Sequence, residues 1–182
     1  IASQQFDIGF AENPKNSELY LTKDFSLRTM IALPDGHPLS KHQTLTPKIL
    51  DGVPICTFLP EHYLTIKLRA AFESVDAKLN IPFFLQNSSA QYAIVENGHA
   101  AGFMSSLSVW LYQQNWEMGS RKKIIFRPFS PLINQNISLI IPKHRSLPQI
   151  SQLFAEKLEG SVRDIINLTK SEFQLDSLGE FN

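Results

Sequence analysis

Two groups of residues could do chemistry at the ends of predicted strands. The first is the S-x-x-Q run from Ser88 to Gln91, which follows an apolar segment of strand length and has the spacing of a helix-capping box. A helix that begins there offers unpaired backbone N–H groups, hydroxyls and the positive end of its dipole, a combination that suits a ligand carboxylate. Glu12, just after the first predicted strand, supplies a negative group.

Together these two groups could hold a zwitterion such as an amino acid, because α/β sheets bind ligands beyond the carboxyl ends of their strands. Taken singly, each has a simpler interpretation. Ser88 can be only a helix cap, and Glu12 only a loop carboxylate.

Other chemistries lack their characteristic motifs. The histidines, His37, His42, His62, His99 and His144, show neither the H-E-x-x-H spacing nor another close ligand spacing, so no metal site is predicted. The sequence contains no G-x-S-x-G elbow, phosphate-binding loop or dinucleotide fingerprint, and no cofactor is predicted. The single cysteine, Cys56, lies in an apolar run where a thiol behaves as a small hydrophobe. One cysteine allows no intramolecular disulfide, so we expect a reducing, cytoplasmic setting.

The composition fits one ordinary globular domain or two small lobes. The 182 residues are 43% hydrophobic and 19% charged. Seventeen Lys and Arg residues balance seventeen Asp and Glu residues, whereas a nucleic-acid binder usually has a basic excess. We therefore do not expect this segment alone to bind DNA. No apolar run approaches the roughly 18 residues that span a bilayer. The chain starts at Ile1 with a strand-like segment close by, so it reads as a fragment without a secretory signal.

Strand-like and helix-like segments alternate along the chain. Strands are expected at residues 6–10, 19–22, 27–33, 53–58, 81–85, 100–104, 124–128 and 137–141. Helices are expected at 46–52, 63–75, 88–98, 106–114 and 148–168. Strands that alternate with helices imply right-handed crossovers and a mostly parallel sheet, so the predicted class is α/β.

The order of several motifs resembles the effector-binding domain of LysR-type transcriptional regulators. The motifs are FDIGF at residues 6–10, PDGHPLS at 34–40, LT at 45–46 with LDG at 50–52, the segment 88–98, and RSL at 145–147 before Phe154. The resemblance extends to about Leu158. The RPFS run at 127–130 is similar to the return crossover of the branch that senses basic amino acids and opines, and Glu12 matches an acidic position of that branch.

The resemblance implies a two-lobed fold like that of type 2 periplasmic binding proteins. Lobe I would comprise about residues 1–30 and 130–168, lobe II about 31–129, and a C-terminal tail about 169–182. Strands near 104–106 and 126–129 would cross between the lobes, and a small effector would lie in the cleft. The family's effector domain opens with a strand, a helix and a second strand, and this chain starts after them.

The resemblance also implies how the domain works. In full-length members a winged helix-turn-helix domain precedes it, so promoter DNA would be reached only through that absent domain. A homodimer or homotetramer without membrane contact is expected. The domain itself would sense an amino-acid-like effector and have no catalysis. Its expected effector-binding residues are Glu12 for the cationic group, Ser88, Ser89 and Gln91 for the carboxylate, and Phe58, His62, Tyr63 and Phe129 around the cleft.

Two alternatives have the same general fold. A solute-binding protein of a transport system would carry a cleavable leader upstream. An enzyme acting on small acids, such as a dehydratase or deaminase, would need a second cleft acid or a perturbed lysine, and no such pair occurs at recognisable spacing.

Overall fold

A computed structural model describes residues 6–12, 14, 18–116 and 124–173 of the chain. The strands are β1 (Gly9–Glu12), β2 (Tyr20–Pro34), β3 (Pro54–Phe58), β4 (Asn80–Leu85), β5 (Ala101–Ser105), β6 (Ile124–Pro128) and β7 (Asn134–Pro142). The helices are α1 (Tyr63–Glu73), α2 (Ser88–Glu96), α3 (Ser106–Trp116) and α4 (Gln149–Glu172), with a short 3-10 helix η1 (Pro38–Lys41). The architecture is α/β, as the alternating segments predict.

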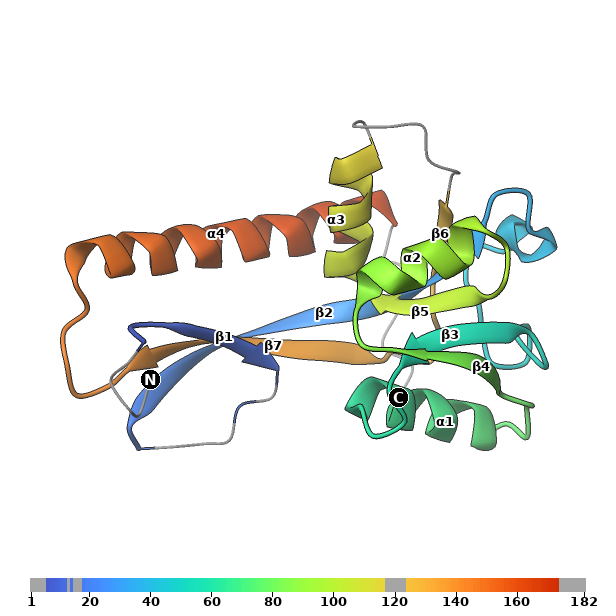
Figure 1. Ribbon diagram of the computed structural model, residues 1–182, viewed down its shortest axis with the longest axis horizontal. Helices are drawn as coiled ribbons and strands as arrows, with labels where there is room; N and C mark the ends of the chain where they lie inside the picture. Colours follow the sequence, from blue (N-terminus) through green and yellow to red (C-terminus); the bar gives the residue numbers. More distant parts are fainter. Residues whose placement is uncertain (1–5, 13, 15–17, 117–123, 174–182) are drawn as a thin grey trace.

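Strand β2 belongs to both halves of the molecule. Its first part, Tyr20–Arg28, pairs antiparallel with β7, which pairs in turn with β1. Its second part lies between β5 and β6. Beyond β5, strands β3 and β4 add parallel pairs. Figure 1 shows β2 running from the β1–β7 end to the β3–β6 end, so one continuous strand joins two lobes.

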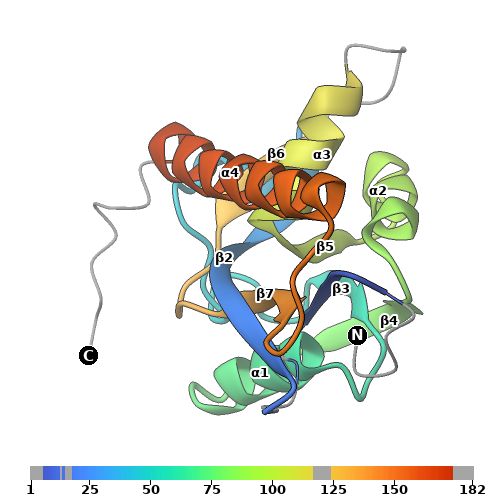
Figure 2. The ribbon, with the colours of Figure 1, turned by 90° about the vertical axis from the view of Figure 1, so that its left-hand side faces the viewer.

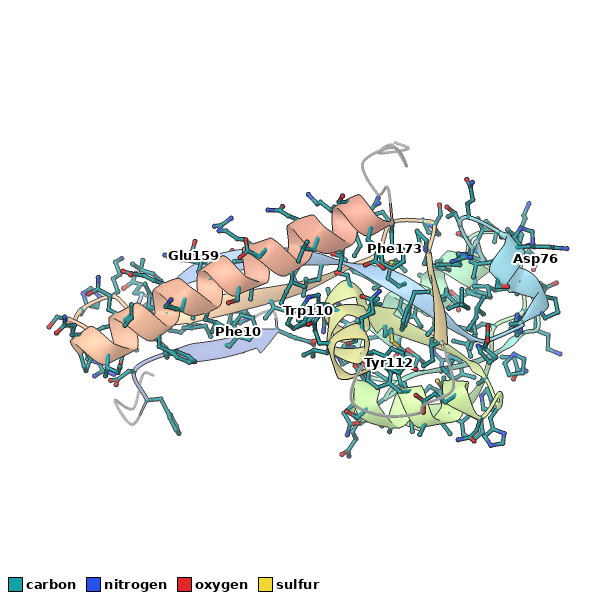
Figure 3. The ribbon with its side chains drawn as sticks, turned by 90° about the horizontal axis from the view of Figure 1, so that it is seen from above. Phe10, Asp76, Trp110, Tyr112, Glu159 and Phe173 are labelled. Carbon is teal, nitrogen blue, oxygen red and sulfur yellow. The ribbon has the colours of Figure 1, made fainter. Side chains whose placement is uncertain are left out.

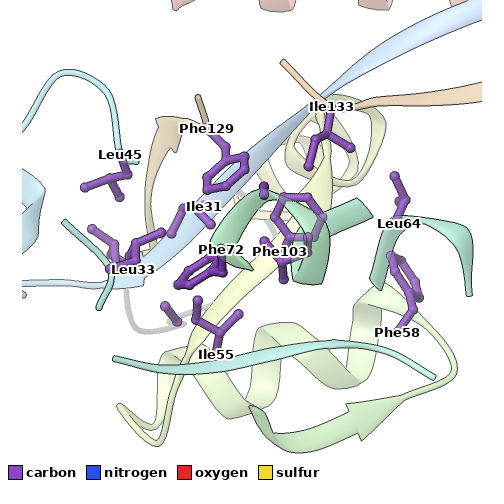
Figure 4. Packing of buried hydrophobic residues seen from close by; sticks show 14 residues of the cluster. Ile31, Leu33, Leu45, Ile55, Phe58, Leu64, Phe72, Phe103, Phe129 and Ile133 are labelled. Atoms are coloured by element: carbon purple, nitrogen blue, oxygen red, sulfur yellow. The ribbon is translucent and has the colours of Figure 1, made fainter. Parts of the chain in front are cut away.

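Helices cover both faces of the β3–β6 lobe. Helix α1 packs on one face through Leu64, Leu68 and Phe72, which lie with Phe103 in an apolar cluster (Figure 4). Helices α2 and α3 lie on the opposite face, where Val95 joins a second cluster. Because apolar side chains are buried on both faces of its sheet, this lobe has a hydrophobic core of its own.

The other lobe carries the long helix α4 along one face of its sheet. Ala155 and Val162 pack on Phe25 and Leu139, and Figures 2 and 3 show α4 lying across β2 and β7. The Glu159 carboxylate accepts hydrogen bonds from Lys23 on β2 and from Arg163, and these bonds hold its pKa below the usual value. The opposite face of this sheet is polar.

The lobes are joined at two places. One is β2 itself, where pairing passes from β7 to β5 between Arg28 and Thr29. The other is the segment after β6, where Ile133 O accepts hydrogen bonds from Thr29 N at 3.0 Å and Thr29 Oγ1 at 2.8 Å. The prediction of a crossing strand near residues 104–106 is therefore wrong, because β5 leads directly into α3.

Several predicted elements differ in extent. The two strands expected at 19–22 and 27–33 form the single strand β2, and the first strand begins at Gly9, not Phe6. Residues 46–52 form turns, not a helix. Helix α4 continues to Glu172, so the predicted tail begins later than residue 169, and its remainder from 174 lies outside the described residues.

The PDGHPLS motif has a structural role. Gly36 adopts φ +74°, a left-handed conformation that glycine takes without strain. His37 then caps η1 by accepting a hydrogen bond from Leu39 N. The Arg127 guanidinium on β6 donates to the carbonyls of Ser40 and His42. The motif thus fixes the loop after β2 against β6.

Candidate functional site

Glu12 and His62 meet where the two lobes face each other. Glu12 ends β1, and His62 is the residue before α1. The His62 Nδ1 atom accepts the N–H of Leu64, so the proton lies on Nε2, which donates to Glu12 Oε2 at 2.9 Å. The second carboxylate oxygen, Oε1, accepts a hydrogen bond from Gln135 Nε2 on β7. Both oxygens of Glu12 therefore have partners within the protein.

Aromatic rings surround this contact. The His62 ring stacks on Phe58, with centroids 4.6 Å apart, and on Tyr63, with centroids 5.0 Å apart. The backbone N–H of Asn136 on β7 donates to the Tyr63 hydroxyl at 3.0 Å. The start of α1 thus contacts the β1–β7 edge through two side chains. Glu12, Phe58, His62 and Tyr63, four of the predicted site residues, lie in one cluster.

The start of α2 forms a second polar group, but Ser88 is not its cap. Asn87 is the N-cap, and its Oδ1 accepts the N–H of Ala90 at 3.0 Å. Ser88 is the first helical residue, and the Gln91 side chain makes no hydrogen bond. The predicted capping box is therefore wrong, because Asn87, as good a cap as serine, lies one residue earlier.

Ser88 instead bonds to the start of α3. Its Oγ lies 2.8 Å from Ser108 Oγ, and Ser105 Oγ lies 3.4 Å from the same atom. The Tyr92 hydroxyl donates to Ser108 O at 2.6 Å. Burial raises the pKa of the Tyr92 hydroxyl to about 12. These bonds fix the N-terminal turns of α2 and α3 beside each other.

Gln91 is fully buried, with 0% of its surface exposed, and neither its Oε1 nor its Nε2 has a hydrogen-bond partner. Buried amides are nearly always paired, so this side chain is unusual. Ser89 lies on the exposed side of the same turn. The structure thus groups Ser88 with Ser105 and Ser108, while Gln91 lies within the same helix, one turn further along, and Ser89 is exposed.

Two residues singled out by type take no part in either group. Phe129 is buried in the α1-side cluster, edge-on to Phe103 with centroids 5.4 Å apart, and its expected role in effector binding stays a prediction. Cys56 is also buried, and burial raises its thiol pKa to about 12, as expected of an inert thiol. Within the described ranges, no three His, Cys, Asp or Glu side chains gather as metal ligands would.

A hollow of about 340 Å³ lies elsewhere, on the polar face of the β1–β7–β2 sheet. Its lining is Pro14, Thr22, Asp24, Phe25, Ser26, Asn136 and Ser138. Its carboxylate, Asp24, is exposed and already accepts a hydrogen bond from Ser138 Oγ at 2.6 Å. We place the candidate site at the inter-lobe residues instead, because Glu12 and Gln135 from one lobe meet His62 from the other there.

Sequence patterns missed Gln135, Ser105 and Ser108. The two serines could have been found, since Ser105 ends a strand and Ser108 lies in the first turn of the helix that follows it. Gln135 gave no local signal, because its contact with Glu12 joins residues that are far apart in the sequence.

In the described parts of the chain, no helix has the length and apolar character needed to cross a membrane.

Two α/β lobes joined by β2 and by the segment after β6, with polar groups between them, define a type 2 periplasmic-binding-protein-like domain. The family model for the LysR substrate binding domain matches residues 1–162. The chain therefore belongs to the LysR substrate-binding domain family, whose members are transcriptional regulators. No curated protein sequence matches it.

Solved structures are similar in fold at low sequence identity. The regulatory domain of Synechocystis PCC6803 CcmR in complex with 2-PG matches with a TM-score of 0.64 and 12% identity, over 92% of this chain and 76% of that one. The effector-binding domain of QuiR in complex with shikimate matches with a TM-score of 0.60 and 13% identity, over 93% of this chain and 74% of that one.

Longer regulators match as well. HinK, a LysR family transcriptional regulator from Pseudomonas aeruginosa, has a TM-score of 0.67 and 16% identity, over 88% of this chain and 54% of that one. The match to a second protein from Pseudomonas aeruginosa, PA01, a putative LysR family transcriptional regulator, covers 53% of that protein's chain. The chain thus spans about half the length of these regulators.

Proposed function

We propose that this chain is the ligand-sensing domain of a LysR-type transcriptional regulator, and that it binds a small amino-acid-like effector between its lobes. The observation that carries the proposal is the meeting of Glu12 on one lobe with His62 on the other at 2.9 Å. A molecule bound there would contact both lobes at once. It could therefore favour one inter-lobe arrangement over another.

The effector's two ends would be held by the two polar groups. Glu12 would meet a cationic group, with Phe58, His62 and Tyr63 packed around it. Ser88, Ser89 and Gln91 would meet the carboxylate at the start of α2, where the helix dipole favours negative charge. CcmR was solved with 2-PG and QuiR with shikimate, and these complexes support a small-molecule ligand for this fold.

The domain would act by population shift and have no catalysis of its own. An effector that prefers one inter-lobe angle would bias the oligomer, a homodimer or homotetramer, and so the DNA-binding domains of the full-length regulator. The net charge of zero suits a domain that leaves DNA contacts to another part of the protein. A cytoplasmic location follows from this role.

Calorimetric titration of the 182-residue chain tests the proposal. The ligands are arginine, lysine, ornithine and a simple aromatic acid. We expect saturable binding of at least one basic amino acid, together with a rise in melting temperature, because a ligand that binds only the folded state stabilises it. Binding of the aromatic acid alone would place the effector in another class. Binding of none would contradict the proposal.

A further inference from the structure

Helix α4 packs along one lobe and ends on the other. Its buried residues are Ala155, Val162, Ile165 and Thr169, and their spacings of seven, three and four residues place them on one side of the helix. Phe173, which ends the helix, follows four residues later on the same side and is half-buried. One side of α4 therefore carries a continuous row of contacts from Ala155 to Phe173.

The two ends of this row pack in different lobes. Ala155 and Val162 lie in one apolar cluster with Phe25 and Leu139 of the β1–β7–β2 sheet. Phe173 packs instead against the second apolar cluster of the β3–β6 lobe, to which α3 contributes. Figure 3 shows Phe173 at the end of α4 that reaches this lobe. The helix thus bridges the lobes, in addition to the two chain connections between them.

A hydrogen bond accompanies the Phe173 contact. Glu172 Oε1, in the last turn of α4, accepts it from Gln113 Nε2 on α3 at 2.6 Å. Both side chains are exposed, so water competes for this bond and its net contribution is small. The apolar contact of the Phe173 ring is therefore the main attachment of the helix end, and the hydrogen bond fixes where that end lies along α3.

The α4 attachment and the Glu12–His62 contact lie on opposite sides of β2. Figures 1 and 2 show α3 and α4 on one side of this strand, and α1, which begins next to His62, on the other. Between them, at Arg28 and Thr29, the pairing of β2 passes from β7 to β5. A rotation of the lobes about that point that separates one contact presses the other together. The two contacts therefore restrain the same inter-lobe angle.

We propose that residues 169–173, which we call the α4 latch, hold the lobes at one relative angle by packing the Phe173 ring against the other lobe. The inference goes beyond the proposed function, because it gives a segment outside the effector site a part in the inter-lobe equilibrium. An effector that favours another angle would have to release Phe173, so the latch would lower the observed affinity for that effector.

The experiment measures the distance between the lobes by pulsed electron paramagnetic resonance on the 182-residue chain without a ligand. Spin labels are attached through Ser146→Cys on one lobe and Ala70→Cys on the other, two exposed positions. The native Cys56 is buried, so the label reacts at the introduced cysteines. Unlabelled chain in excess removes distances between copies. We expect one narrow distance peak, and a broader or displaced peak in Phe173→Ala.

Phe154→Ala is the matched control for this test. Phe154 is 58% exposed near the start of α4, so the same chemical change there should leave the distance peak unaltered. Phe173→Leu keeps an apolar side chain against the cluster and should give a peak between those of Phe173→Ala and the unsubstituted chain. If Phe173→Ala does not fold, Phe173→Leu decides, and an unchanged peak in that variant would overturn the latch.

The outcomes separate this inference from the proposed function. A broad distance distribution in the unsubstituted chain, an unchanged peak in Phe173→Ala, or an equal change in Phe154→Ala would each overturn the latch. None of these results depends on an effector, because no ligand is present. A changed peak in Phe173→Ala alone would support the latch even if calorimetric titration found no binding of a basic amino acid.

Discussion

His62 has two hydrogen bonds that act in different lobes. Its Nδ1 caps α1 through the N–H of Leu64, and its Nε2 donates to Glu12 on β1. The position of α1 is thereby coupled to the position of β1. Because His62 already satisfies one Glu12 oxygen, a cationic effector must compete with it or join it. The inter-lobe contact and the cationic group of the proposed effector would therefore use the same carboxylate.

Glu12→Gln should weaken binding of a cationic amino acid by about tenfold or more and leave an uncharged carboxylic acid unaffected. The change keeps size and hydrogen-bonding capacity but deletes the charge. The free energy of unfolding should change by less than about 1 kcal/mol, since Glu12 and His62 form a partly exposed pair. Calorimetric titration with arginine and with a simple aromatic acid measures the two affinities, and urea denaturation measures the free energy of unfolding. Unchanged arginine affinity in Glu12→Gln would show that Glu12 is only an inter-lobe contact.

His62→Asn should have the opposite effect on cation binding. Asparagine is a favoured N-cap, so α1 keeps its start, but its shorter side chain releases Glu12. With that competitor removed, arginine affinity should rise a few-fold. Calorimetric titration measures the affinity, and circular dichroism of the variant controls for loss of α1. A fall in affinity with α1 intact would mean that packing of the His62 ring against the effector outweighs its competition for Glu12.

Paired substitutions at positions 87 and 88 test which residue caps α2. At an N-cap, glycine costs only a few tenths of a kcal/mol and alanine about 0.5–2 kcal/mol, so Asn87→Gly should be the more stable variant of its pair. Within a helix the order reverses by about 1 kcal/mol, so Ser88→Ala should be more stable than Ser88→Gly. Urea denaturation of the four variants measures this. The same order at both positions would contradict Asn87 as the cap.

The elements that the sequence predicted well carry their signals locally. Helix α1 shows its apolar spacing within a few turns, and the positive φ of Gly98 ends α2 where a glycine is expected. The sequence pattern predicts two strands in place of β2, because the polar pair Lys23 and Asp24 interrupts the apolar positions. Those side chains lie on an exposed stretch whose backbone still pairs with β7.

The turn at residues 46–52 shows the limit of local signals. Thr46 does accept hydrogen bonds from Ile49 N and Leu50 N, as the start of a helix would. Gly52, at φ +71°, then reverses the chain before a second turn forms. The contacts between the lobes cannot be predicted from local sequence signals, for a different reason. Glu12 and His62 are 50 residues apart, and only the tertiary fold brings them together.

Stability should fall at alkaline pH because of Cys56 and Tyr92. Burial raises the pKa of the thiol from 9.0 and of the phenol from 10.0, each to about 12. Between those values the folded chain keeps protons that the unfolded chain releases, so this contribution is complete below about pH 9 and is lost as pH rises toward 12. Urea midpoints across this range measure it. Cys56→Ala should flatten the loss, and an identical slope in that variant would contradict the assignment.

The start of α4 carries an exposed apolar surface that should promote self-association. Ile150 is 74% exposed, Leu153 50% and Phe154 58%, and their spacing places them on one side of the helix. Strand β1, within the described residues, pairs only with β7, and its Phe10 is 40% exposed. Apolar patches and unpaired strand edges both favour association. We therefore expect sedimentation velocity to show oligomers at micromolar concentration.

Charge substitutions distinguish the α4 surface from the β1 edge as the cause of association. Leu153→Glu combined with Phe154→Glu should shift the chain toward the monomer, because burying two carboxylates at an apolar contact is costly. Leu168→Glu alters an equally exposed leucine near the other end of α4 and should leave the sedimentation profile unchanged. Loss of oligomers in that control would indicate a general charge effect. A stable monomer in the unsubstituted chain would contradict association through either surface, and oligomers that persist in the double variant would assign it to the β1 edge.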